Sequence, residues 1–182
     1  MTVRPTRLPG VLVVEPRVFS DARGFFAETY QRQRYQEAGI LDEFVQDNLS
    51  CSSKGTLRGL HYQNPNPQAK LVQVLRGEVF DVAVDIRLGS PTFGQWVGET
   101  LSESNRLQLY VPQGFAHGFV VISDEALFCY KVGDYYNPGA DGGVRWDDPD
   151  IAIEWPVSDP MLSPKDAAAP LLREIDSARL SF

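Results

Sequence analysis

The stretch EVFDVAVDIR, residues 78–87, alternates two kinds of side chain along its length. Apolar residues from Phe80 to Ile86 take the even-numbered positions, whereas Asp81 and Asp85 lie among the odd-numbered positions. Successive side chains of a β-strand point to opposite faces, so this spacing predicts a strand with one apolar and one mixed face. It is the clearest strand of the chain, and it favours a fold built from β-sheets.

Short runs with the same period of two recur along the chain, separated by Gly, Pro, Asn or Ser. We expect further strands at residues 11–15, 25–29, 44–52, 57–63, 70–75, 95–101, 106–111, 117–122 and 126–132. Many short strands at this spacing predict an antiparallel all-β sandwich or barrel. One helix is expected at residues 31–38, ended by Gly39, and residues 160–178 are expected to form short helical turns over the barrel.

The length and composition fit one globular domain over residues 1–182. The 17 basic and 24 acidic side chains leave a net charge of -7, which argues against a broad surface for nucleic acid. The opening residues lack the apolar core of a signal peptide, and no run approaches the roughly 20 apolar residues that span a bilayer. We therefore expect no membrane contact, a cytoplasmic location, and free thiols at Cys51 and Cys129.

Polar side chains occupy one face of the expected strand at residues 44–52. The polar positions, which alternate with mostly apolar ones, are Gln46, Asn48, Ser50 and Ser52. Two interpretations stay open. These groups form the solvated face of an antiparallel sheet, or they line a cavity and hydrogen-bond a polar ligand.

The chain contains only two histidines, His61 and His117. Metal sites in small β-barrels typically use two or three imidazoles with an acid, and no His-x-His pair occurs, so we expect no metal and no other cofactor. A histidine titrates near neutral pH and serves as a general base when a carboxylate orients it. Asp81, Asp85 and Asp166 are all candidates for that carboxylate, and spacing does not choose among them. No Gly-x-Ser-x-Gly elbow and no phosphate-binding glycine loop is present, which argues against hydrolases.

Several motifs follow one another in a fixed order over nearly the whole chain. The most specific are DARGFFAE at 21–28, QDNLS at 46–50, LRGLHYQ at 57–63, PQGFAHGF at 112–119 and LSPKD at 162–166. Together they closely resemble the dTDP-4-dehydrorhamnose 3,5-epimerase family. The resemblance implies an all-β, cupin-like antiparallel barrel or jelly roll with a few short peripheral helices. It also implies an isomerase that converts dTDP-4-dehydro-6-deoxy-D-glucose, a dTDP-4-keto-6-deoxyhexose, to dTDP-4-dehydro-L-rhamnose.

Metal-free acid–base chemistry is part of what the resemblance implies. A carbonyl at C4 of the sugar acidifies the hydrogens at C3 and C5, so epimerisation needs a base, a group that stabilises the enolate, and an acid. By resemblance His61 is the base and Asp166 is the carboxylate that orients it. Tyr130 is the acid, whose phenol can also relay a proton if its pKa is lowered near the enolate. Lys70 offsets the negative charge on the enolate oxygen.

The same resemblance assigns the residues that bind substrate. Arg23, Arg58 and Lys165 match positions near the diphosphate, where guanidinium groups fit phosphate oxygens. The other matched contact positions are Glu28, Gln46, Asn48, His117, Asp141 and Tyr136, which stacks on the thymine. Asp141 departs from the family pattern, which usually has glutamate there. A homodimer is implied as well, with N-terminal strands exchanged so that residues near Phe26 line the partner's cavity.

One spacing conflicts with these assignments. Arg58 and His61 are three residues apart, and a regular strand would point them to opposite faces. A bend or bulge at Gly59 would bring both side chains to the same side.

Two other classes of function stay open. Relatives on the same barrel epimerise only C3 or only C5, or isomerise the keto group, and they can keep both His61 and Tyr130. The second class is a non-catalytic sugar-nucleotide binding module, which would bind the ligand without exchanging its hydrogens for solvent deuterium.

Overall fold

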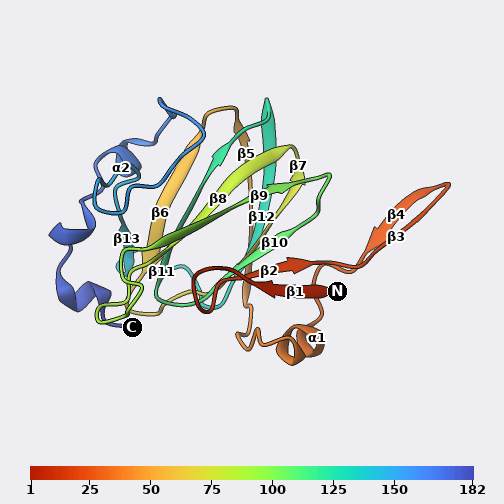
Figure 1. The fold of residues 1–182 in the computed structure, drawn as a ribbon, viewed down its shortest axis with the longest axis horizontal. Helices are drawn as coiled ribbons and strands as arrows, with labels where there is room; N and C mark the ends of the chain where they lie inside the picture. The colour runs from red at the N-terminus through yellow and green to blue at the C-terminus, as the bar shows by residue number, and fades with distance from the viewer.

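The fold consists of thirteen strands and a few short helices, and the computed structural model describes all of residues 1–182 (Figure 1). The strands are β1 (Thr2–Pro5), β2 (Leu12–Glu15), β3 (Val18–Asp21), β4 (Gly24–Ala27), β5 (Gln46–Ser53), β6 (Leu57–Gln63), β7 (Lys70–Arg76), β8 (Glu78–Asp85), β9 (Trp96–Ser102), β10 (Gln108–Val111), β11 (Phe115–Val121), β12 (Glu125–Val132) and β13 (Asp141–Gly143). The helices are α1 (Arg32–Glu37) and α2 (Pro164–Ala167), with single 3-10 turns at η1 (Leu172–Glu174) and η2 (Ser177–Leu180). The expected all-β class with short peripheral helices is confirmed.

Two antiparallel sheets make up the body of the molecule, with strand orders β1-β2-β10-β7-β12-β5 and β13-β6-β11-β8-β9. The strands from β5 to β12 divide equally between them, as β10-β7-β12-β5 in one and β6-β11-β8-β9 in the other. This interleaved order of two four-stranded sets is the jelly-roll arrangement. The cupin-like double sheet expected from the resemblance is therefore confirmed.

Strand β8 is buried on both faces, which its alternating sequence pattern alone did not predict. Its even-numbered residues, such as Val82 and Val84, belong to an apolar cluster that also includes Leu180 from the C-terminal segment. Its odd-numbered residue Ala83 belongs to the main core cluster, whose members come from strands of both sheets. Both faces of β8 are therefore buried, and Asp81 is fully buried within the protein.

Three short strands were not predicted, namely β1, β3 and β13. Each has only three or four residues, and each pairs on one side only, at a sheet edge or in the hairpin of β3 with β4. Edge strands this short carry no repeated apolar face, so their pairing is decided by the neighbouring strand. The expected strand at 106–111 begins instead at Gln108, because Arg106 has a positive φ of 53° and directly follows the turn at residues 103–105.

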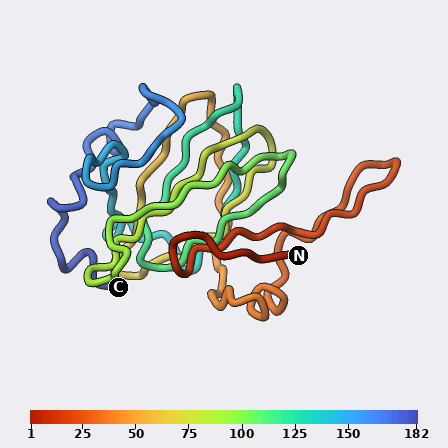
Figure 2. The backbone as a smooth tube through the Cα atoms, viewed as in Figure 1, coloured from red at the N-terminus to blue at the C-terminus, as the bar shows by residue number.

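The N-terminal hairpin, formed by β3 and β4, extends away from the double sheet (Figures 1 and 2). Its aromatic side chains face solvent in the single chain, and Phe26 is 68% exposed. The helix expected at residues 31–38 follows as α1, whose N-terminus is capped by the Gln31 side chain accepting from the Arg34 amide. Gly39 ends it with a φ of 93°, a conformation that glycine adopts without steric cost.

The C-terminal residues lie against the outer face of the five-stranded sheet, where α2, η1 and η2 form the short turns expected at 160–178 (Figure 1). Cys51 and Cys129 are both free thiols, as expected. None of the helices has the length and apolar character needed to cross a lipid bilayer.

Candidate active site

A bulge in β6 brings Arg58 and His61 to one side of the strand. His61 is paired with His117 of β11 and Arg58 with Phe119, so three steps along β6 match two along β11. The bulge expected at Gly59 is therefore confirmed. Gly59 has a φ of 130°, and a Cβ there would lie 2.6 Å from the Cα of Gly118, so the close approach of the two backbones requires glycine.

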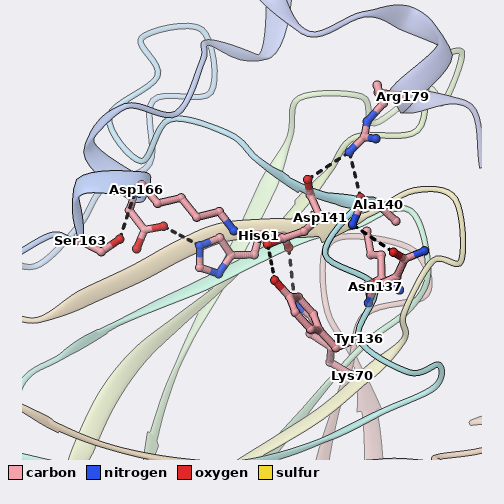
Figure 3. Close-up of polar contacts among 12 residues, drawn as sticks. His61, Lys70, Tyr136, Asn137, Ala140, Asp141, Ser163, Asp166 and Arg179 are labelled. Atoms are coloured by element: carbon pink, nitrogen blue, oxygen red, sulfur yellow. Dashed lines mark hydrogen bonds and ion pairs between the residues drawn. The ribbon is translucent and has the colours of Figure 1, made fainter.

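His61 forms a hydrogen-bonded pair with Asp166, with 2.6 Å between Nε2 and Oδ1 (Figure 3). Asp166 comes from α2, whose N-cap Ser163 accepts a hydrogen bond from the Asp166 amide. Burial works to raise the pKa of Asp166, but hydrogen bonds with His61 and Ser163 outweigh it and hold the pKa below its usual value. Asp166 is therefore ionised at neutral pH, while the His61 side chain stays 35% exposed at the cavity wall.

Lys70 lies beside this pair at the start of β7. It is buried, and its Nζ donates to the His61 backbone carbonyl at 3.3 Å (Figure 3). Burial lowers the pKa of Lys70 to about 8, against the opposing attraction of Asp81 and Asp141. A buried ammonium near neutral pH is a strong local source of positive charge in a site with little water.

A second histidine–aspartate pair lies deeper in the same region. Nε2 of His117 lies 2.9 and 3.0 Å from the two carboxylate oxygens of Asp81, and both side chains are buried. Burial lowers the pKa of His117 and raises that of Asp81, and their mutual attraction opposes both shifts. No three His, Cys, Asp or Glu side chains cluster closely enough to bind a metal ion together.

Tyr130 and Arg58 complete a cavity of about 570 Å³ that also contains His61, Lys70 and His117. Burial raises the pKa of the Tyr130 phenol, and the nearby Arg58 charge opposes the shift. A proton relay through this phenol requires a lowered pKa, but without substrate the pKa of Tyr130 is raised. The phenol therefore keeps its proton at neutral pH. Nε of Arg58 donates to the Ser52 hydroxyl at 3.0 Å.

The polar face of β5 lines this cavity and a second one beside it. Ser50 and Ser52 line the first cavity, whereas Gln46 and Asn48 line the second, which has a volume of about 380 Å³. On the opposite side of β5, Leu49 is 63% exposed. Of the two interpretations left open by the sequence, the structure supports the cavity wall. The apolar side of the strand is exposed, and its Leu49 and Cys51 also border the first cavity.

Asp141, Tyr136 and Lys165 form a small polar network in the wall of the second cavity. The Asp141 carboxylate accepts from the Tyr136 hydroxyl at 3.1 Å and from the Lys165 ammonium. Lys165 and His61 line both cavities, so the two are parts of one cleft. Asp141 therefore reaches this network although it is one methylene shorter than the glutamate expected there from the resemblance.

Three of the expected binding residues lie far from this cleft within one chain. Arg23, Phe26 and Glu28 belong to the N-terminal hairpin or its base, and none of them lines either cavity. Arg23 is paired with Asp21 of the same hairpin, and Glu28 is paired with Arg34 of α1. The other assigned residues, from Gln46 onward, all lie in the cleft.

Sequence reasoning did not single out some residues of the cleft. The buried Gln63 accepts from the Asn137 amide at 2.8 Å and donates to the Tyr135 carbonyl, so it fixes the loop that carries Tyr136. Asp81, which is fully buried and lines neither cavity, was only one of three candidate carboxylates. Its place on the mixed face of the clearest strand was the available signal, but choosing it required knowing which strand lies beside β8.

These groups define an acid–base site on a double-sheet barrel: an oriented imidazole, a buried ammonium and a protonated phenol share one cleft. Such a set can remove a proton from carbon beside a carbonyl, stabilise the resulting enolate and return a proton. The family model described as dTDP-4-dehydrorhamnose 3,5-epimerase matches residues 5–174. The chain belongs to this family.

Individual relatives agree with this membership. The dTDP-4-dehydrorhamnose 3,5-epimerase of Salmonella typhimurium is 57% identical, with 94% of this chain and 96% of the relative covered. A crystal structure of the 3,5-epimerase from Legionella pneumophila in complex with dTDP-4-keto-L-rhamnose has a TM-score of 0.97 and 55% identity, covering 99% of this chain and 97% of that one. A dTDP-4-dehydrorhamnose 3-epimerase from Streptomyces niveus is 44% identical, with 99% of this chain and 88% of the relative covered.

Proposed function

We propose that this protein inverts C3 and C5 of dTDP-4-dehydro-6-deoxy-D-glucose and so produces dTDP-4-dehydro-L-rhamnose. The observation that supports this most directly is the single cavity in which the His61–Asp166 pair, the Lys70 ammonium and the Tyr130 phenol all lie. Proton transfer beside a ketone needs these three kinds of group. Double epimerases are also the relatives with the higher sequence identity.

His61 removes the proton in the proposed reaction. Because Asp166 is ionised, it accepts the Nε2 proton of His61, which leaves Nδ1 unprotonated and able to act as the base. The electron pair of the broken C–H bond at C5 or C3 forms a double bond to C4, and the carbonyl π electrons move to the C4 oxygen. Asp166 then stabilises the imidazolium that forms.

The enolate and the returning proton involve the opposite sheet. Lys70 of β7 and Tyr130 of β12 belong to the six-stranded sheet, whereas His61 of β6 belongs to the five-stranded sheet. A sugar held between the sheets therefore has the base on one face and the phenol on the other. In this proposal the Lys70 ammonium stabilises the negative C4 oxygen. Tyr130 donates its proton to the enolate carbon from the face opposite His61 as the C4 carbonyl re-forms, which inverts the centre. Solvent then reprotonates Tyr130 and takes the proton from His61 before the second centre is inverted.

The remaining cleft residues bind the rest of the substrate. Arg58 and Lys165 are the cations assigned to the diphosphate, since phosphate oxygens match both charges. Tyr136, whose side chain lies at the mouth of the second cavity, is assigned to the thymine ring. Gln46 and Asn48 supply amide groups on the same wall, and His117 and Asp141 complete the contacts.

A second copy of the chain completes the site in this proposal. The N-terminal hairpin extends from the body (Figure 1). Its Phe26 is exposed, and so is Leu49 on the outward face of β5. Exposed aromatic side chains gathered on one hairpin are typical of an interface. In a homodimer the hairpin would reach the partner's cleft and supply Arg23, Phe26 and Glu28 to a site that one chain leaves open.

Hybrid dimers test this sharing of residues. His61→Ala and Arg23→Ala chains are each nearly inactive alone, but a hybrid dimer has one site with both residues intact. Random exchange of chains makes half of the dimers hybrid, so mixing should restore about a quarter of wild-type activity. Sedimentation should show a dimer. No recovery on mixing, with exchange verified by mass spectrometry, would place Arg23 in its own chain's site or outside any site.

Deuterium incorporation tests the reaction itself. The purified protein, treated with a chelator, is incubated with the dTDP-4-keto-6-deoxyglucose substrate in deuterated water, and the sugar is followed by NMR and mass spectrometry. Deuterium at both C3 and C5 is expected. Deuterium at one carbon only would indicate a single-centre epimerase instead, and binding without exchange would indicate a binding module.

The proposed location of this reaction is the cytoplasm. The free thiols of Cys51 and Cys129 fit a reducing compartment. Fusion of a fluorescent protein and cell fractionation would test the assignment.

A further inference from the structure

Asp141 lies on β13, the shortest of the strands that line the site. Strand β13 has three residues and lies at the edge of its sheet, where it pairs only with β6. Asp141 is opposite Gln63 in this pairing, and Gly143 is opposite His61. The outer side of β13 has no neighbouring strand, so other groups must satisfy and hold its backbone.

Arg179 contacts this wall from the C-terminal segment. Its guanidinium Nη2 donates to the Ala140 carbonyl at 2.9 Å and to the Asp141 carbonyl at 3.2 Å (Figure 3). One cationic group thus joins two successive carbonyls at the start of β13. Hydrogen bonds from a charged donor are stronger than those between neutral groups. Arg179 also lies beyond residue 174, where the family match ends.

The segment that presents Arg179 is itself fixed on both sides. Asp176 caps η2 by accepting from the Ala178 amide at 2.9 Å. Leu180 is buried in the apolar cluster outside the five-stranded sheet, and its carbonyl accepts from the Leu88 amide at 3.0 Å. The Asn64 side chain donates to the Arg179 carbonyl at 3.1 Å. Arg179 is therefore held in place, and it can hold β13 in turn.

The position of the β13 backbone decides what the Asp141 side chain can reach. Its carboxylate contacts both the Tyr136 hydroxyl and the Lys165 ammonium, the groups assigned to the thymine and the diphosphate. The Asp141 side chain is short, so a shift of the strand cannot be absorbed by extra length. A displaced backbone would separate the carboxylate from both partners at once.

We infer that Arg179 is a positioning residue for the nucleotide-binding half of the cleft, acting through the backbone of Ala140 and Asp141. This inference rests on the proposed function, which assigns Tyr136 and Lys165, two residues of the second cavity, to the thymine and the diphosphate. Arg179 contacts neither His61 nor Tyr130, so its effect falls on binding. Because Gly143 of β13 pairs with His61 and Asp141 acts on the pKa of Lys70, a smaller effect on the catalytic step is expected as well.

Three variants of the full-length protein test the inference. Arg179→Ala removes both contacts to the strand. Arg179→Lys keeps the charge, but it replaces the planar group whose Nη2 donates to both carbonyls with a tetrahedral ammonium on a shorter side chain. Arg173→Ala is the matched control, since Arg173 is an arginine of the same C-terminal segment that pairs with Asp150 on the surface and does not contact β13. Affinity for dTDP is measured by calorimetry, and kcat and KM are measured with the 4-keto sugar nucleotide.

In Arg179→Ala the Kd for dTDP and the KM should each rise about tenfold, the effect typical of losing hydrogen bonds to a charged group. Its kcat should stay within about twofold of wild type. Arg179→Lys should recover part of the affinity, and Arg173→Ala should match wild type. A loss confined to kcat, or an unchanged Kd for dTDP in both Arg179 variants, would overturn the inference. Wild-type protein that does not bind dTDP would instead remove the proposed function, and this inference with it.

Discussion

The two histidine–aspartate pairs of this protein have the same chemistry in different surroundings. His61 lies at the wall of the cleft with its side chain 35% exposed, whereas the His117 side chain is only 7% exposed. Asp166 comes from a short helix far along the chain, while Asp81 lies on β8, directly beside the strand of His117. The pKa shifts also differ, because hydrogen bonds lower the pKa of Asp166 while burial raises that of Asp81.

Under the proposed function, this difference in surroundings separates a reactive pair from one that mainly supports the fold. An ionised Asp166 leaves His61 ready to accept a proton from a ligand in the cleft. The buried pair is held by a hydrogen bond between His117 and Asp81. The negative charge of Asp81 lies near Lys70 and acts to raise its pKa. Removing a member of the first pair should therefore affect rate, and removing a member of the second should affect stability.

The largest expected effect is on the rate after removal of the exposed histidine. His61→Ala should lower the rate of deuterium exchange at both C3 and C5 roughly 10³-fold, because it deletes the general base. Calorimetry should show nearly unchanged affinity for dTDP. His117→Ala should lose less rate and more stability, and equal rate losses in the two variants would contradict the distinction between the pairs.

The next effect is on the free energy of unfolding. Asp81→Ala should lower it by about 3 kcal/mol, because the buried His117 loses its hydrogen-bond partner and a void remains. Urea denaturation followed by circular dichroism measures the change. Asp150→Ala is the control, since that carboxylate forms an exposed pair with Arg173 and should cost less than about 1 kcal/mol. Equal losses would mean that the buried pair is not a source of stability.

A smaller change is expected when the orienting carboxylate loses its charge. Asp166→Asn should lower kcat roughly 30-fold, because the amide no longer selects the tautomer in which Nδ1 of His61 is the base. The Kd for dTDP should stay the same, because Arg58 and Lys165 are untouched. A variant with normal kcat would show that Asp166 does not orient the base.

The smallest effect is a pH dependence due to Lys70. Its pKa is lowered to about 8, so the protonated form that stabilises the enolate is lost as the pH rises through that value. The kcat/KM should therefore fall above pH 8 by about tenfold per pH unit. Because Asp81 raises the pKa of Lys70, Asp81→Asn should move this fall to lower pH. In Lys70→Arg the fall of kcat/KM above pH 8 should disappear, since a guanidinium keeps its proton. A fall that persists in this variant would show that Lys70 is not its source.

Local pattern predicted much of the fold. The alternation in 78–87 and in the other short runs identified ten of the strands, and Gly39 marked the end of α1. The short edge strands were missed because their pairing depends on neighbours distant in sequence. The conflict between Arg58 and His61 predicted a bulge at Gly59, since both side chains can face one cavity only if the strand is irregular.

The sequence by itself determined the double-sheet class, the family and most residues of the cleft, because strand periodicity and ordered motifs are properties of the chain alone. Only the tertiary structure decided that the polar face of β5 turns inward, that Asp81 meets His117, and that Arg179 holds the wall of the site. The physical reason is that a strand's own alternation gives two faces without saying which is inside. Pairs separated by many residues form only after the sheets have packed.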